Sequence, residues 1–338
     1  MPVPMTSIGD LAGNYANRLQ TARIKTELQR LTAELSTGRP VDPVAHLGGD
    51  TARLALIERN IAVAKARATA ATGLGQILST MQTILGDVDA VRGNLAAQLV
   101  PLTESSTPRD IERASLAGRD AFRDIVGRLN GTFGGGSLFA GTGTDAPALA
   151  DADDMLASLA AAAAGSVTAA DVRAAVDAWF DDPAGGFATM GYLGDTGDPM
   201  TRRIDEGVSV TLSARADHPV LKDLLRQTAY VALASDPALA LPESTADALV
   251  RGGLSDLYGL AAPLTDLRAE LGLAEERTAD AASRNGALAA ALTLSRNDLA
   301  LVDPYATAVA LTQTETQLET QFAVTARLSG LSLVNFLR

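Results

Sequence analysis

The chain has 338 residues, enough for two or three domains, and 47% of them are hydrophobic while only 4% are aromatic. A core with so few rings is built mostly from Ala and Leu, which favours closely packed helices over a β-sandwich or a deep ligand pocket. The formal net charge of −12, with no basic stripe, argues against nucleic acids and anionic membrane surfaces as partners. The absence of Cys excludes disulfides, thiol catalysis and Cys-based zinc sites.

We expect no cleavable secretory signal in the first residues, because Met1 to Leu11 lack a basic start followed by an apolar core. The most apolar tract, Met155 to Val167, is Ala-rich and too short to span a bilayer. If the protein leaves the cell, we expect it to use a route that does not read such a signal.

The N-terminal part predicts long helices. Apolar residues recur every three or four positions from Ile8 onward, and Gly38 with Pro40 marks the end of that helix. Asp50 is the predicted N-cap of the next helix. Its apolar stripe is typical of a coiled-coil or bundle seam and comprises Leu54, Ile57, Ile61, Ala64, Ala68 and Ala71, then, after a one-residue shift, Leu74, Ile77, Met81, Ile84, Val88, Val91 and Leu95.

A third helix is predicted after Thr107-Pro108-Arg109-Asp110, which reads as an N-cap, a Pro at the first helical position and an acid near the third. One face of this helix carries Ile111, Ser115, Gly118, Phe122, Ile125 and Leu129.

From Ser137 to Asp217, Gly, Asp and Pro become frequent and strand-like pieces appear. Val208 to Leu212 alternates apolar and polar residues like a half-buried strand, Ser137 to Thr144 is a second candidate extended segment, and Thr168 caps a short predicted helix. The middle is therefore predicted to be a small α+β insertion.

Helices return after the insertion, near Pro219–Ala234 and Thr245–Leu260. The longest regular pattern then runs from Leu264 to Val302, where the residues of one helix face recur at alternating spacings of three and four positions without a break. Asp303 caps a last predicted helix that has Pro304 in its first turn and ends near Leu337.

These elements predict a mainly α fold, an elongated rod of long antiparallel helices from both chain ends with the small α+β insertion in the middle. A helix of some 35 residues is about 50 Å long. The predicted division comprises a terminal-helix domain (1–40 and 303–338), a helical rod domain (41–136 and 218–302) and an insertion domain (137–217).

Several motifs resemble the flagellin family. Leu35-Ser36-Thr37-Gly38-Arg39 resembles its helix-ending motif, and Asp303-Pro304-Tyr305-Ala306 its Asp-Tyr-Ala start. Ala326 to Leu337 is similar to the family's ending almost position by position. Two central segments, Ser137 to Thr142 and Arg203 to Val208, resemble the hook–filament junction proteins within that family.

The resemblance implies a structural, non-enzymatic subunit of the bacterial flagellum, exported without cleavage and located outside the cell. Its implied partners are copies of itself, another hook-associated junction protein, flagellin and a flagellar export chaperone. In such an assembly the terminal helices of neighbouring copies would pack together. The predicted assembly residues are Ile8, Leu11, Tyr15, Leu19, Leu311, Leu318, Phe322, Leu328, Leu331 and Leu333.

The last helix is poor in charge, since only Glu315, Glu319 and Arg327 occur between Ala306 and Leu337. This composition favours packing among neighbours, and the alternative is an ordinary buried C-terminal helix. Catalysis, cofactors and metals are not predicted. His46 and His218 have no metal-ligand companion, Asp151, Asp153 and Asp154 lack the calcium-loop pattern, and Gly134 to Gly136 lacks the Lys of a phosphate loop.

Two other functions stay open on the sequence. The chain fits a filament flagellin, which copy number in isolated flagella would distinguish from a junction subunit. It also fits, less well, a helical signalling or binding module that dimerises through its coiled coil and stays inside the cell.

Overall fold

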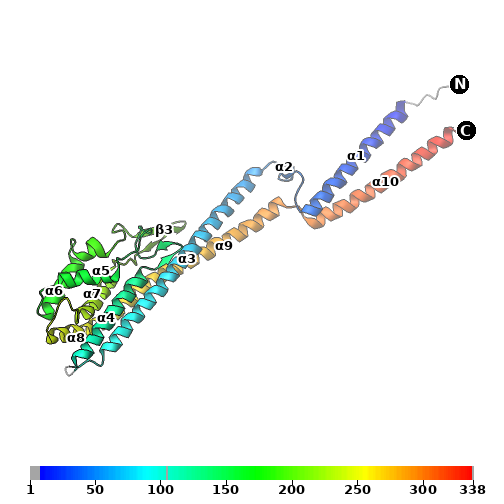
Figure 1. The fold of residues 1–338 in the computed structure, drawn as a ribbon. Helices are drawn as coiled ribbons and strands as arrows, with labels where there is room; N and C mark the ends of the chain where they lie inside the picture. The colour runs from blue at the N-terminus through cyan, green and yellow to red at the C-terminus, as the bar shows by residue number, and fades with distance from the viewer. Residues whose placement is uncertain (1–7, 104–105, 337–338) are drawn as a thin grey trace. The chain divides into compact units, whose positions relative to one another are not determined.

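The computed structural model describes residues 8–103 and 106–336. The described chain is mainly helical, and its strands form two small antiparallel pairs, which confirms the predicted fold class (Figure 1). It separates into two compact units, residues 1–65 with 286–338 (unit 1) and residues 66–285 (unit 2). Two long helices, α3 (Thr51–Leu99) and α9 (Ala261–Ala300), contribute to both units. The three-domain division made from the sequence stays a prediction.

The core of unit 2 lies between α4 (Pro108–Leu129) and α7 (Pro219–Leu233), the two helices in closest contact. Gly118 allows this approach, because a Cβ there would lie 2.7 Å from Val231 Cγ1. Beside it, the buried Ser115 hydroxyl donates to the Ala232 carbonyl at 2.9 Å. The helix face predicted to hold Ser115 and Gly118 is therefore buried.

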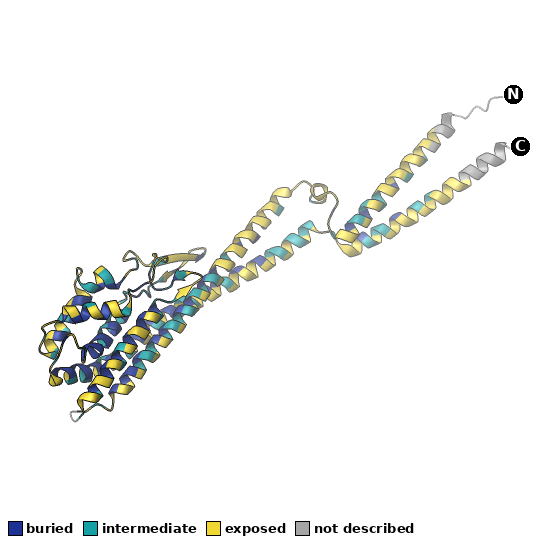
Figure 2. Ribbon diagram, viewed as in Figure 1, coloured by how far each residue is buried: buried dark blue, intermediate teal, exposed yellow. Residues whose placement is uncertain are grey.

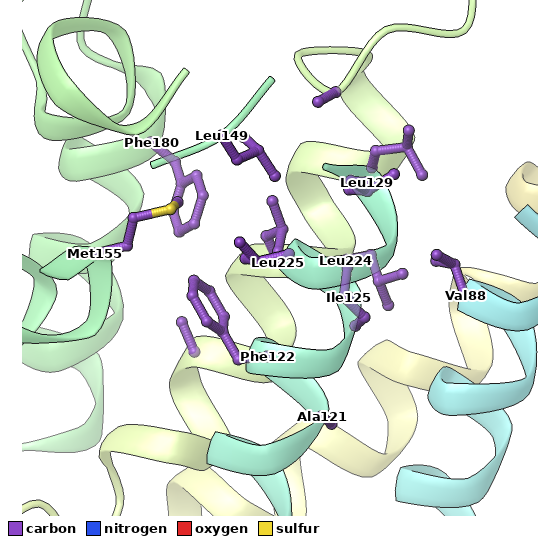
Figure 3. Close-up of a cluster of buried hydrophobic side chains, with 14 of the residues drawn as sticks. Val88, Ala121, Phe122, Ile125, Leu129, Leu149, Met155, Phe180, Leu224 and Leu225 are labelled. Atoms are coloured by element: carbon purple, nitrogen blue, oxygen red, sulfur yellow. The ribbon is translucent and has the colours of Figure 1, made fainter. Parts of the chain in front are cut away.

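Aliphatic and aromatic side chains from several helices share this core (Figure 3). Phe122 of α4 and Leu225 of α7 are fully buried, together with Met155 of α5 (Ala152–Ala162) and Phe180 of α6 (Ala169–Asp181). Helix α8 (Glu243–Gly259) packs on α7. The helices of the predicted insertion thus bury their apolar faces against helices that flank it.

Local caps fix the helix starts, at Thr107 and Thr168 as predicted and at Asp151 where no cap was predicted. Thr168 and Asp171 form a reciprocal capping box at α6, with Asp171 N donating to Thr168 Oγ1 at 3.2 Å. At α4, the Thr107 backbone N–H and hydroxyl both donate to the Asp110 carboxylate, and these hydrogen bonds lower the pKa of Asp110. Asp151 caps α5 by accepting from the N–H groups of the next helical residues.

The strands of unit 2 form two hairpins. The short pair β1 (Thr132–Phe133) and β2 (Gly136–Ser137) turns through Gly134 and Gly135, whose positive φ values of 59° and 86° suit glycine. The longer pair is β3 (Met200–Asp205) and β4 (Val208–Leu212), and it includes the predicted half-buried strand. The predicted extended segment from Ser137 to Thr144 is wrong beyond Ser137, where the chain bends and Gly141 adopts a φ of 70°.

A π-helical turn, η1 (Phe187–Gly191), closes around the single Trp of the chain. The Trp179 ring packs edge-on against Phe180 at 4.8 Å between centroids, and its indole N–H donates to Ser158 Oγ at 2.9 Å. The buried tryptophan makes a spectroscopic probe of the unit 2 core.

The apolar stripe of α3 was predicted only in part. Most of the predicted stripe is buried, namely Ile57, Ile61, Ala64, Ala71, Leu74, Met81, Val88 and Leu95, but Leu78 and Leu85 are fully buried and were not predicted. The residues just before them, predicted for the seam, are only half-buried. Periodicity cannot choose between adjacent apolar residues, so the neighbouring helices decide which one faces inward.

Unit 1 contains α1 (Ile8–Thr37), the short α2 (Pro43–His46), the start of α3, the end of α9, and α10 (Pro304–Phe336). Its buried residues form narrow stripes, visible as scattered dark segments on mostly exposed helices in Figure 2. Among the described residues no helix is long and apolar enough to cross a membrane.

Candidate assembly surface

The two ends of the chain meet in the pair α1–α10, which lies within unit 1 (Figure 1). The pairing is antiparallel: Gln321 Nε2 donates to Asn17 Oδ1 at 3.4 Å, and at the other end Val302 N donates to the Gly38 carbonyl at 3.2 Å. The two residues of the first contact, Asn17 and Gln321, are 304 positions apart in the sequence, and those of the second contact are fewer positions apart. The separation shrinks along the pair because the two helices run in opposite directions.

The seam between α1 and α10 is narrow. On α1 the buried side chains include Ile24 and Leu31, and on α10 they are Thr307 and Thr314, each pair one heptad apart. A full coiled-coil seam buries two residues per heptad. Half-buried residues such as Leu28, Leu311 and Leu318 flank the seam. Most of the surface of both helices is therefore not covered by another segment of the described chain.

The predicted assembly residues fall partly on this unpartnered surface. Tyr15 is 69% exposed, Leu19 40% and Phe322 50%, whereas Leu311 and Leu318 are half-buried beside the seam. The remaining predicted residues have side chains outside the described part of the structure, namely Ile8, Leu11, Leu328, Leu331 and Leu333.

Other exposed apolar residues were missed from the sequence. Tyr305 is 80% exposed, and Val309, one helical turn later, and Val324 are also exposed. The four-residue spacing of Tyr305 and Val309 was the available signal. It was overlooked because α10 has so few charged residues that several of its faces look apolar.

The polar groups of α10 are largely satisfied within the helix. The hydroxyls of its threonines donate to the carbonyl four residues earlier at 2.7–3.1 Å, at Thr307, Thr312, Thr314, Thr316, Thr320 and Thr325. A buried donor without a partner costs about 1–3 kcal/mol. Because these donors already have partners, a neighbouring helix can cover them without that penalty.

The charges of α1 are also used locally. Arg30 bonds to Glu27 and Glu34 on the same helix, and the Arg30 hydrogen bond lowers the pKa of Glu27. The Glu34 carboxylate is almost fully buried and accepts the Val41 N–H at 3.1 Å. Together with Gly38, which ends α1 at a φ of 67° as predicted, these contacts fix the turn that follows α1.

The remaining candidate residues have local structural roles. His218 is the N-cap of α7, and its Nδ1 accepts the Val220 N–H at 3.4 Å, while His46 is exposed at the end of α2. Burial lowers the pKa of His218. Within the described residues, no three His, Asp or Glu side chains gather into a group that could hold a metal ion.

The comparisons place the C-terminal part of the chain among known proteins. Residues 259–337, which include all of α9 and α10, match the family described as the bacterial flagellin C-terminal helical region. A search of curated protein sequences finds no match to the chain.

Solved structures share the fold. One is a Vibrio parahaemolyticus protein described as flagellar hook-associated, which is 16% identical and has a TM-score of 0.52. The match covers 76% of this chain and 98% of that chain. At this identity the likeness concerns the fold.

The match of residues 259–337 to the flagellin C-terminal helical region supports the predicted structural role in the flagellum. The chain is thus flagellin-like in its C-terminal part: residues 259–337 match the flagellin C-terminal helical region, and the fold is shared with a protein described as flagellar hook-associated.

Proposed function

We propose that this chain is a junction subunit of the flagellum, which joins the hook-associated region to the flagellin filament. The observation that carries the proposal is the α1–α10 pair, with its narrow seam, exposed apolar side chains and few charges. The flagellin-type C-terminal region and the fold shared with a hook-associated protein support it.

In this proposal α1 and α10 of one copy pack against the same helices of neighbouring copies. Exposed rings such as Tyr15 and Phe322 would become buried, each contributing on the order of 1–3 kcal/mol. The threonine hydroxyls of α10 would enter the assembly with their donors already paired. The partners are then copies of the chain, a second hook-associated protein and flagellin, and an export chaperone would cover the apolar helices before assembly.

The test combines Leu318→Asp with Phe322→Asp, two residues one helical turn apart on α10. In the free chain Phe322 is half-exposed, with Lys25 Nζ 5.8 Å from its ring centroid, so its replacement costs about 1 kcal/mol. In an assembly each carboxylate would be buried and unpaired, at a cost of several kcal/mol that repeats in every copy.

We expect the double variant to melt within a few degrees of the parent and, in cells, to lose filaments while flagellin leaks into the medium. Leu273→Asp is the control, because Leu273 on α9 of unit 2 is 55% exposed, about as much as Phe322. Normal filaments in the double variant, or filament loss in the control as well, would refute α10 as the assembly surface.

Copy number separates the alternatives. A junction subunit forms a small ring, so labelled antibody should mark one point at the base of each sheared filament. Labelling along the whole filament would indicate a filament flagellin. Retention of the wild-type chain inside the cell would favour the signalling module and overturn the flagellar proposal.

A further inference from the structure

The β3–β4 hairpin of unit 2 is weakly supported along its length. It has only two strands, and an isolated two-stranded hairpin is marginally stable in water. Ile204 and Val210 bury their side chains in the core. Yet a cavity of about 220 Å³ lies beside the hairpin, lined in part by Met200 and Leu212 from its strands and by Leu74 from α3. The open end of the hairpin, where Met200 pairs with Leu212, therefore packs incompletely on α3.

The tip of the hairpin makes a set of polar contacts to both long helices. Asp205 Oδ1 lies 3.6 Å from Arg67 Nη1 on α3, and Asp205 Oδ2 lies 3.5 Å from Arg284 Nη2 on α9. The Asn285 side chain on α9 adds a hydrogen bond to the same carboxylate. Only 17% of the Asp205 side chain is exposed. One carboxylate thus connects α3, α9 and the hairpin.

This carboxylate also separates two like charges. Arg67 and Arg284 both approach Asp205, and the other carboxylate at the tip, Glu206, is 3.7 Å from Arg67 and 88% exposed. Without Asp205, Arg67 would keep the exposed Glu206 as a partner, while Arg284 would lose its ion pair to the hairpin. Asp205 therefore supplies an ion pair to each of the two helices, whereas Glu206 contacts α3.

The seam between α3 and α9 is made of small side chains at this level. Ala71 on α3 and Thr278 and Ala281 on α9 are fully buried, and a Cβ on Gly75 would lie 3.7 Å from Thr278 Cγ2. Small side chains bury little apolar area, and glycines in the middle of a helix weaken it. Polar contacts at the tip therefore add to a seam that buries little apolar area at this level.

We propose that the β3–β4 hairpin is a strap, a segment that holds α3 against α9 at the end of unit 2. Asp205 makes the ion pairs to both helices that keep the strap in place. Releasing the strap opens the helix pair locally, around residues 66–76 of α3 and 276–285 of α9, without unfolding the core between α4 and α7. Local openings of this kind are distinct from global unfolding and have their own free energies.

The test is hydrogen–deuterium exchange of the full chain carrying Asp205→Asn, which keeps the size of the side chain and removes its charge. The variant loses the two ion pairs of Asp205, so we expect amide exchange to rise roughly five- to tenfold in both helix segments. Glu206→Gln is the matched control and should leave exchange unchanged, because Glu206 is 88% exposed and contacts α3, whereas Asp205 contacts both helices. Trp179 fluorescence should report an intact core in both variants.

Arg284→Gln is a second test, because it removes one of the two ion pairs of Asp205. It should raise amide exchange in the same two segments by less than Asp205→Asn does. The proposal is overturned if Asp205→Asn raises exchange in the hairpin alone while both helix segments stay protected. It is equally overturned if the Glu206→Gln control opens the segments to the same extent, or if Asp205→Asn unfolds the whole core together with them.

Discussion

The close crossing of α4 and α7 makes Gly118→Ala a sharp test of the packing in unit 2. An added Cβ would lie 2.7 Å from Val231 Cγ1 and 2.8 Å from the backbone N of Ala232. Real Cβ atoms do not approach other atoms so closely, so one helix must shift. A backbone atom cannot rotate away as a side chain can, and the neighbouring Ser115–Ala232 hydrogen bond would be strained by the same shift.

The expected magnitude follows from two opposing effects. Overpacking a core costs about 1–3 kcal/mol, and contact with backbone places this site at the upper end. Replacing a helical Gly with Ala recovers about 1 kcal/mol of helix propensity. We therefore expect Gly118→Ala to lower the free energy of unfolding by about 2 kcal/mol, or the Tm by about 4–8 °C.

Gly127 on the same helix is the matched control, because it is exposed and an added Cβ would meet nothing within 4 Å. Gly127→Ala should raise the free energy of unfolding by about 1 kcal/mol. Urea unfolding followed by Trp179 fluorescence measures both variants. If Gly118→Ala is as stable as Gly127→Ala, the close crossing of α4 and α7 is not present in solution.

Two further substitutions test the core and its titration. Phe122→Ala should lower the free energy of unfolding by about 3–5 kcal/mol, because removal of the fully buried ring would leave a cavity between α4 and its neighbours (Figure 3). A loss below about 1 kcal/mol in the same urea assay would contradict this expectation. Burial lowers the pKa of His218, so the unfolded chain binds the proton more readily than the folded one, and this residue's contribution to stability is present above about pH 6.5 and lost as the pH falls. His218→Asn keeps an N-cap acceptor for the Val220 N–H and removes the titrating imidazole. The free energy of unfolding of this variant should therefore fall less between pH 7.5 and 5.5 than that of the parent. An equal fall in both proteins would show that the pKa of His218 does not change on folding.

Much of the helical architecture could be predicted from local signals. Gly38 ends α1, Thr107-Pro108 begins α4 and Asp303-Pro304 begins α10, as the sequence indicated. Caps and breakers act within about four residues, so their effect does not depend on the rest of the fold. The charge-poor composition of α10 also drew attention to the candidate assembly surface before any contact was known.

Tertiary structure decided which faces became buried. Leu78 and Leu85, not the isoleucines before them, turn inward on α3, and Tyr305 and Val309 lie on the exposed side of α10. Periodicity ranks positions by their spacing alone, and adjacent apolar residues satisfy it almost equally well.

The contacts that join distant segments had no local signal at all. Asp205 meets Arg67 and Arg284 only because a hairpin folds across two helices that lie far apart in the chain. Sequence alone thus determined where helices begin and end and which family the C-terminal region resembles. The partners of each helix face, and the residue that bridges α3 to α9, were decided by the tertiary structure, because long-range packing selects among faces that local chemistry leaves equivalent.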